Sequence, residues 1–222
     1  MTHTEAEFYR APMKITVRAL QSQHDGAEVV VCVLLESGEH REEQRLPLTV
    51  EQYCELKPTK GEIDEEFFEQ LEQASRLCQA IRSSENLLSY GANTVYTLTQ
   101  KLTRRGFSRE VALEAAERMQ QMGMINEEEY LRREFEKCLQ KLWGSKRIYA
   151  HMWERGFAKD TIERLPMLLE TVDFVENCAK LMQKHYASVP TDRDERRRLV
   201  ASLSRYGYSL DEIRGAFATV GN

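Results

Sequence analysis

The sequence predicts a mainly α-helical protein in which three tandem three-helix repeats form an elongated, curved solenoid. Apolar residues recur at helical spacing from about residue 64 onward. A glycine-centred pattern also returns three times, at intervals of about fifty residues. A cluster of β-branched residues near the start adds a small β-hairpin-containing region before the repeats.

The repeated pattern centres on Gly106, Gly156 and Gly207. In each copy two apolar residues four positions apart precede the glycine, and an aromatic residue follows it. The apolar pair marks the buried stripe of a helix, and glycine takes the left-handed conformation that ends a helix without strain. Each copy therefore predicts a helix, a tight turn and a second helix.

Capping residues support the second helix of each copy. Ser108 and Ser209 stand where a side chain caps the following helix, and Ser209 with Glu212 predicts a capping box. Ala158, in the middle copy, is a weak cap. The aromatic residue before each cap is expected to pack onto the helix that follows it.

A third helix completes each repeat. These helices are expected at roughly 64–88, from Asn126 toward Gly144, and at roughly 171–187. One unit alone buries too little surface, so stacked neighbours would supply the core. The predicted parts are an N-terminal region at 1–60 and repeats at 61–123, 124–170 and 171–222.

The N-terminal sixty residues have a β character. Strands are expected at Ile15–Leu20 and Glu28–Glu36, with Arg41–Leu46 as the hairpin partner of the second strand. A short helix is expected from Thr49 to just before Lys57. The stretch 57–61 is the best candidate for a linker, and 188–191 is a second, between two helices of the third repeat.

The composition fits a soluble, cytoplasmic, helix-rich protein. No apolar run of the 222 residues approaches the roughly 18 needed for a membrane helix, and Met1–Glu7 does not resemble a signal peptide. The five cysteines lie far apart, so free thiols in a reducing compartment are expected. The net charge of −5 is uneven, because residues 1–75 carry −9 and residues 76–222 carry +4. A basic part of this kind can attract an anionic surface.

Signatures of catalysis are absent from the sequence. It contains no Gly-rich phosphate loop, no Gly-x-Ser-x-Gly turn and no His-Glu-x-x-His motif. His151 is better explained as a surface or packing residue than as a metal ligand, and Glu127–Glu129 as the acidic first turn of a helix. We therefore expect a protein that is not an enzyme and that uses no metal or cofactor.

Basic residues give the best candidates for binding. Arg133, Lys137 and Lys141 recur every four positions and share a helix face. The full candidate face for a partner or for DNA comprises Arg104, Arg105, Arg132, Arg133, Lys137, Lys141, Lys146, Arg147 and Arg155. The alternative is that these are solubilising charges paired with neighbouring acids. The run Arg196–Arg198 is a weaker candidate, because acids stand beside it, and Trp143 and Trp153 are expected to pack in the core.

The three-fold pattern resembles the RecX family, bacterial regulators of the RecA recombinase. The resemblance rests on Leu98 to Phe107, on Gly123 to Tyr130, which reads Gly-Met-Ile-Asn-Glu-Glu-Glu-Tyr, and on Gly144 to Ile148. It covers roughly residues 75–220, and the preceding hairpin resembles longer members of the family. The entry to the first repeat, Ser89 to Thr94, departs from the family pattern at its basic and acidic positions.

The resemblance implies a modulator that lies in the groove of the RecA–single-stranded-DNA filament. It would restrain ATP hydrolysis, strand exchange and filament growth, and so act in homologous recombination, DNA repair and the SOS response. Its partners would be RecA, the RecA filament and, in addition, DNA itself, with the protein a monomer that contacts no membrane. The alternative is a helical DNA-binding module that acts on DNA directly.

Overall fold

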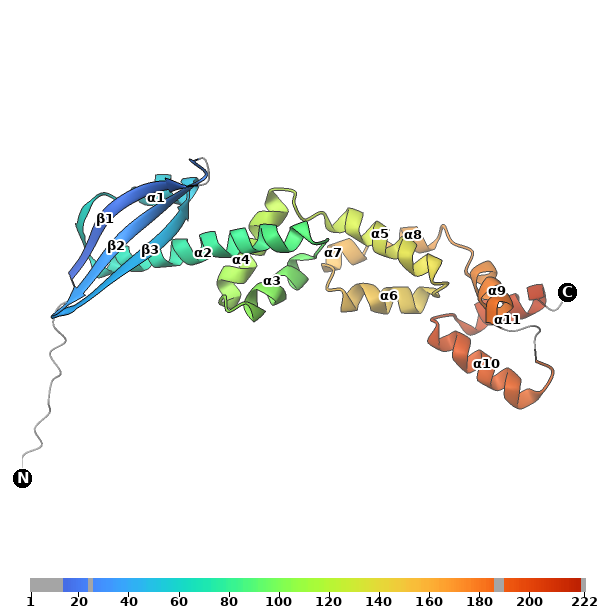
Figure 1. Cartoon of the computed structure of the whole chain (residues 1–222). Coiled ribbons are helices and arrows are strands. Elements are labelled where there is room, and N and C mark those ends of the chain that lie inside the picture. The colour runs from blue at the N-terminus through green and yellow to red at the C-terminus, as the bar shows by residue number, and fades with distance from the viewer. Residues whose placement is uncertain (1–13, 24–25, 186–189, 221–222) are drawn as a thin grey trace, which may run out of the picture. The chain divides into compact units, whose positions relative to one another are not determined.

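The computed structural model describes residues 14–23, 26–185 and 190–220. Its elements fall into two compact units, one formed by residues 1–86 and 102–115, the other by residues 87–101 and 116–222. The protein is mainly helical with a small antiparallel sheet near the N-terminus, as predicted (Figure 1). The division into an N-terminal region and three repeats, and the solenoid that they would form, stay predictions.

The N-terminal strands form a four-stranded sheet in the order β3-β2-β1-β4. β1 (Lys14–Gln23) pairs with β2 (Glu28–Ser37), and β2 forms the predicted hairpin with β3 (His40–Thr49), all antiparallel. β4 (Gly61–Ile63) pairs with the start of β1 and was not predicted, because three residues are too few to show an alternating pattern. The sheet therefore reaches past the stretch that was the best linker candidate.

The short helix α1 (Val50–Leu56) lies where the sequence predicts it. Thr49 and Gln52 form a capping box at its start, and Lys57 ends it in the left-handed conformation. The side-chain Nε2 of Gln52 also donates to the backbone carbonyl of Ala74, 2.9 Å away, which ties α1 to the next helix.

The long helix α2 (Glu65–Ser89) packs against the sheet through its first turns. Phe68 and Leu71 join Ile15, Val31 and Leu48 in one buried cluster, which is the core of the first unit. Figure 1 shows α2 running along the sheet in this unit. Burial of the sheet's apolar face is the main stabilising term here.

The remaining helices follow in groups around the predicted turns. They are α3 (Val95–Arg104), α4 (Arg109–Gln121), α5 (Glu127–Gln140), α6 (Ser145–Glu154), α7 (Lys159–Ile162), α8 (Leu165–Leu169), α9 (Phe174–His185), α10 (Arg193–Arg205) and α11 (Leu210–Val220). The single helix implied after Gly156 is divided into α7 and α8. Pro166, which has no backbone N–H, stands in the first turn of α8 and cannot donate back into α7.

One hydrophobic core extends through the second unit from α5 to α11. Its fully buried members include Ile148, Met152, Leu165, Cys178 and Tyr208. The apolar pairs that precede the turn glycines are buried in all three copies. These are Leu98 and Leu102, Ile148 and Met152, and Leu199 and Leu203.

The three turn glycines have the predicted left-handed backbone. Their φ angles are +97° at Gly106, +69° at Gly156 and +98° at Gly207. The capping predictions also hold, since Ser108 accepts from the amide of Val111 and Ser209 forms a reciprocal capping box with Glu212. Ala158 gives no side-chain cap, as expected.

All five cysteines are free thiols, and Cys54 alone among them is exposed. Burial raises the pKa of Cys78 and Cys138 to about 11, so these thiols stay protonated at neutral pH. Within the described ranges, no helix is long and apolar enough to cross a membrane. Residues 1–7, and the first two residues of the linker candidate 188–191, lie outside the described residues.

Candidate partner-binding surface

Helix α5 carries the centre of the predicted basic face. Asn126 caps its start by accepting from the amide of Glu129, 3.0 Å away. Leu131, Phe135 and Cys138 face the core, while Arg132, Arg133 and Lys137 are exposed. Lys141 is also exposed and forms the C-cap of the helix.

A buried carboxylate, Glu134, engages two of the predicted cations. Its side chain is 5% exposed, and Lys137 Nζ lies 2.8 Å from Oε1. His151 Nε2 lies 3.2 Å, and Arg155 NH2 3.4 Å, from the other carboxylate oxygen. The charges of Lys137 and Arg155 are therefore partly neutralised by Glu134. This agrees with the alternative interpretation, in which the basic residues are paired with neighbouring acids.

The pKa of Glu134 is lowered, although burial by itself would raise it. Hydrogen bonds from Lys137 and His151 and the charge of Arg155 outweigh the burial. The folded pKa lies below the unfolded one, so this carboxylate contributes stability that is present above about pH 4.5 and is lost as the pH falls through the folded pKa.

We expect the Glu134→Gln variant to be less stable than the wild type at pH 7, and the difference to shrink as the pH falls toward 3. The measurement is the midpoint of urea unfolding of both proteins at several pH values. A difference that stays constant from pH 7 to pH 3 would contradict the assignment of a stabilising, ionised Glu134.

Arg147 is held between two aromatic rings rather than left free. Its guanidinium carbon lies 4.2 Å from the centre of the Trp143 ring and 5.4 Å from that of Tyr206. Lys141 Nζ lies 4.9 Å from the same Trp143 ring. Such cation–π contacts place Arg147 at the contact between α6 and the turn after α10.

That contact is also made by the backbone. The amide of Gly144 donates to the carbonyl of Tyr206, and the amide of Lys146 donates to that of Gly207, at 2.8 and 3.2 Å. A Cβ at Gly144 would meet the backbone of Gly207 and of Tyr208. The start of α6 thus lies directly on the third turn glycine.

An equivalent contact joins α3 to the second turn glycine. Thr94 Oγ1 donates to the carbonyl of Arg155, 3.2 Å away, and the ring of Tyr96 lies against Gly156. Arg155 and Tyr206 stand at equivalent positions, one residue before their turn glycines. The same kind of contact is therefore used twice in the second unit.

Glu127 strengthens the contact of α3 with the second turn, and its role was not predicted from the sequence. One carboxylate oxygen accepts from the amide of Val95 at 2.9 Å, and the other from the amide of Ala158 at 3.0 Å. Glu127 is 5% exposed, so it joins the starts of two helices and supplies the cap that Ala158 lacks. The interpretation of Glu127 as only an acidic first-turn residue was incomplete.

The other basic residues of the predicted face are exposed and make few contacts with acids. Arg104 and Arg105 are exposed on the first unit, where Arg105 donates to Ser83 Oγ at 2.7 Å. Lys146 is exposed, and Arg133 makes only a long contact of 3.8 Å with Glu129. A continuous basic stripe across all of these residues stays a prediction.

The two tryptophans differ in how far they are buried. Trp143 packs against the core, as predicted, and its ring lies nearly perpendicular to that of His151, with the centroids 5.2 Å apart. Trp153 is 55% exposed, so the expectation of core packing was wrong for this residue. Trp153 lies one position beyond the buried Met152, on the outer side of α6, and adds an aromatic ring to the surface.

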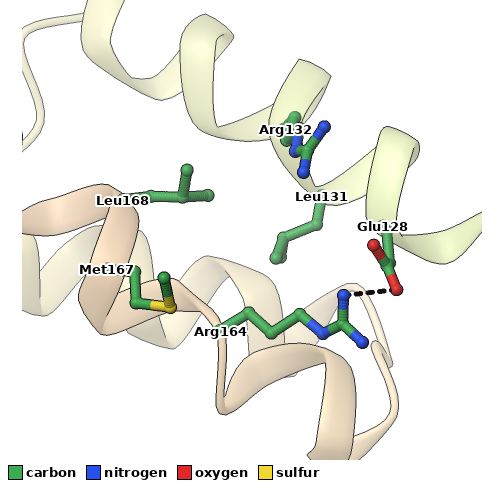
Figure 2. A pocket seen from close by; sticks show the side chains of 6 residues that line it. All are labelled: Glu128, Leu131, Arg132, Arg164, Met167 and Leu168. Carbon is green, nitrogen blue, oxygen red and sulfur yellow. Dashed lines mark ion pairs between the residues drawn. The ribbon is translucent and has the colours of Figure 1, made fainter.

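A small hollow lies beside Arg132, between α5 and α8 (Figure 2). Leu131, Met167 and Leu168 give it apolar walls, and Arg132 and Arg164 stand at its rim. Arg164 NH1 lies 2.5 Å from Glu128 Oε1. Within the described ranges, no group of three or more metal-ligating side chains could hold a metal ion.

Comparison with known proteins identifies the family. Regulatory protein RecX of Pseudomonas savastanoi pv. phaseolicola is 31% identical over 134 residues, which cover 60% of this chain and 85% of that protein. The chain belongs to the RecX family. RecX of Ectopseudomonas mendocina is 29% identical over 88% of its length, and RecX of Halorhodospira halophila 27% over 92%. No family model matches the chain.

Solved RecX structures share the fold. A crystal structure of regulatory protein RecX superposes with a TM-score of 0.70 at 16% identity, over 90% of this chain and 97% of that one. RecX from Lactobacillus salivarius gives a TM-score of 0.57 at 20% identity, over 66% of this chain and 97% of that one. The family is one of regulatory proteins, which agrees with the expected function class.

Proposed function

We propose that this RecX-family protein binds RecA and its filament on single-stranded DNA, and that it inhibits ATP hydrolysis, strand exchange and filament growth. Membership of the RecX family is the observation that carries the proposal. A protein of this kind needs no catalytic residue, because preferential binding to one state of a filament shifts its equilibrium. We place it in the cytoplasm and expect a monomer.

The exposed cations of the second unit support the proposal. Arg132, Arg133, Lys141 and Lys146 are exposed. Lys137 and Arg155 are exposed as well, but both pair with Glu134. The repeated contacts of α3 with Gly156 and of α6 with Gly207 support stacking of three-helix repeats into a solenoid. Such a stack would present its cations along one extended surface.

The direct test is RecA-catalysed ATP hydrolysis on single-stranded DNA, with this protein titrated below the RecA concentration. We expect inhibition at low stoichiometry. An unchanged rate of hydrolysis, with filament length in electron micrographs also unchanged, would contradict the proposal.

Charge reversal should locate the surface. We expect Arg133→Glu combined with Lys141→Glu to weaken binding to the RecA filament about tenfold, since both side chains are exposed. Within the described residues Lys141 has no ion pair, and Arg133 has only the exposed one of 3.8 Å with Glu129. Lys137 is unsuitable for this test, because a glutamate there would face Glu134. Binding is measured by fluorescence anisotropy of the labelled protein.

The matched control changes the same charge elsewhere in the unit. Lys180 and Lys184 lie on α9, where Lys180 pairs with the exposed Glu176 one turn away as Arg133 does with Glu129. Lys180→Glu combined with Lys184→Glu should leave binding within about twofold. Equal losses in the two double variants would show a general charge effect and remove the α5 surface from the proposal.

Direct DNA binding is the second candidate, and α10 favours it. Arg193, Arg196 and Arg197 line a broad hollow on this helix together with Val200 and Asp194. Arginines on one helix can contact successive phosphates. This function predicts tight binding to bare DNA, with an affinity that falls steeply as salt rises, and no effect on RecA beyond competition for DNA.

A further inference from the structure

The hollow between α5 and α8 combines an apolar floor with a surplus of positive charge (Figure 2). Leu131 and Leu168 form its inner side, and Met167, which is 73% exposed, leaves a large apolar side chain at the surface. The volume is about 160 Å³, which is enough for one side chain of a partner. A solvated charged face would not need an exposed methionine at this place.

The charges at the rim are unequal. Arg164 is paired with Glu128, but the side chain of Arg132 makes no ion pair or hydrogen bond with another residue in the ranges that the structure describes. Figure 2 shows Arg132 on α5, with Arg164 and Met167 on the facing segment. The rim therefore offers one guanidinium that lacks a carboxylate, beside a pocket for an apolar side chain.

We infer that this hollow, Glu128–Arg132 and Arg164–Leu168, is a docking site for an acidic segment of a partner protein in which an apolar side chain stands next to carboxylates. The apolar side chain enters between Leu131 and Met167, and a carboxylate accepts from the Arg132 guanidinium. Arginine favours a planar carboxylate through two parallel hydrogen bonds. Residues that dominate binding energy in interfaces lie in well-packed pockets, and arginine is enriched among them.

The inference rests on the proposed function in one respect, which is that the segment belongs to RecA. The preference of the hollow for an apolar side chain beside carboxylates is tested with peptides, without RecA. The full chain is labelled with ¹³C at the methionine methyl groups, and the Met167 signal is assigned from its loss in Met167→Leu. Capped seven-residue peptides with an Asp-Leu-Asp, Lys-Leu-Lys or Asp-Gly-Asp core are then titrated.

We expect a saturable shift of the Met167 methyl signal with the Asp-Leu-Asp peptide only. In Arg132→Glu the signal should remain but should no longer shift with this peptide. No shift with any peptide would overturn the inference. A shift with Lys-Leu-Lys of equal size would also overturn it, since the pocket would then be a nonspecific apolar surface. A Met167 shift that depends on protein concentration alone would show a second copy of this chain as the occupant, against the inference.

Binding of variants to the RecA filament distinguishes the docking site from the proposed function. We expect Arg132→Glu to lower affinity for the RecA filament about tenfold, and Lys159→Glu, an exposed charge reversal on α7 outside the hollow, to leave it within about twofold. A wild-type protein that does not bind RecA would contradict the proposed function and leave the peptide result standing. Wild-type binding that Arg132→Glu does not change would contradict the docking site alone.

Discussion

Gly207→Ala is expected to lower the free energy of unfolding of the second unit by about 2 to 5 kcal/mol. The backbone there has a φ of +98°, which costs a residue with a Cβ about 1 to 2 kcal/mol. The new Cβ would also lie 2.5 Å from the backbone nitrogen of Arg147. Overpacking against backbone that cannot move aside adds about 1 to 3 kcal/mol.

Gly123→Ala is the matched control. Gly123 also has a positive φ, +74°, and lies in the same unit, but a Cβ there would meet nothing within 4 Å. We expect a loss of only about 1 to 2 kcal/mol, from the backbone conformation alone. Urea unfolding followed by circular dichroism measures the free energy of unfolding of both variants. Equal losses would show that the close approach of α6 to Gly207 adds nothing to the cost of a Cβ there.

Glu127→Ala is expected to cost about 3 kcal/mol or more. The substitution removes both acceptors of the buried carboxylate and leaves the amides of Val95 and Ala158 without these partners. Hydrogen bonds to a charged group contribute about 1.5 to 3 kcal/mol each. Amide hydrogen exchange should also become faster at Val95 and Ala158, which a general loss of helix stability would not select.

The neighbouring Glu128→Ala supplies the comparison. Glu128 is half exposed and pairs with Arg164 at the surface, where an ion pair contributes at most about 1 kcal/mol. We expect a change below that value and unaltered exchange at Val95 and Ala158. A larger loss in Glu128→Ala than in Glu127→Ala would contradict the role given to Glu127.

The candidate surface was only partly predictable. The sequence identified a basic stretch on α5, and the spacing of Arg133 and Lys137 placed both on an exposed helix side. The spacing of Glu127, Leu131, Glu134 and Cys138 contained the missing signal, because it puts both acids on the buried stripe with Leu131 and Cys138. Lys137 is a local partner of Glu134, three positions away. The other contacts of the two acids, to Val95, Ala158 and His151, span 17 to 32 positions along the chain, and no local pattern contains that information.

The sequence by itself determined the mainly helical class of fold, the three glycine turns and the family, although not the division of α7 from α8. Periodicity, turn glycines and caps act within a few residues, so they can be found without the fold, and Gly106, Gly156 and Gly207 have the conformation that they require. Only the tertiary structure decided which charges are free. Glu134 engages Lys137 and Arg155, and Trp143 and Tyr206 hold Arg147, whereas Arg132 stays exposed beside an apolar hollow. The physical reason is that charge pairing and burial depend on distances between elements, and packing alone sets those distances.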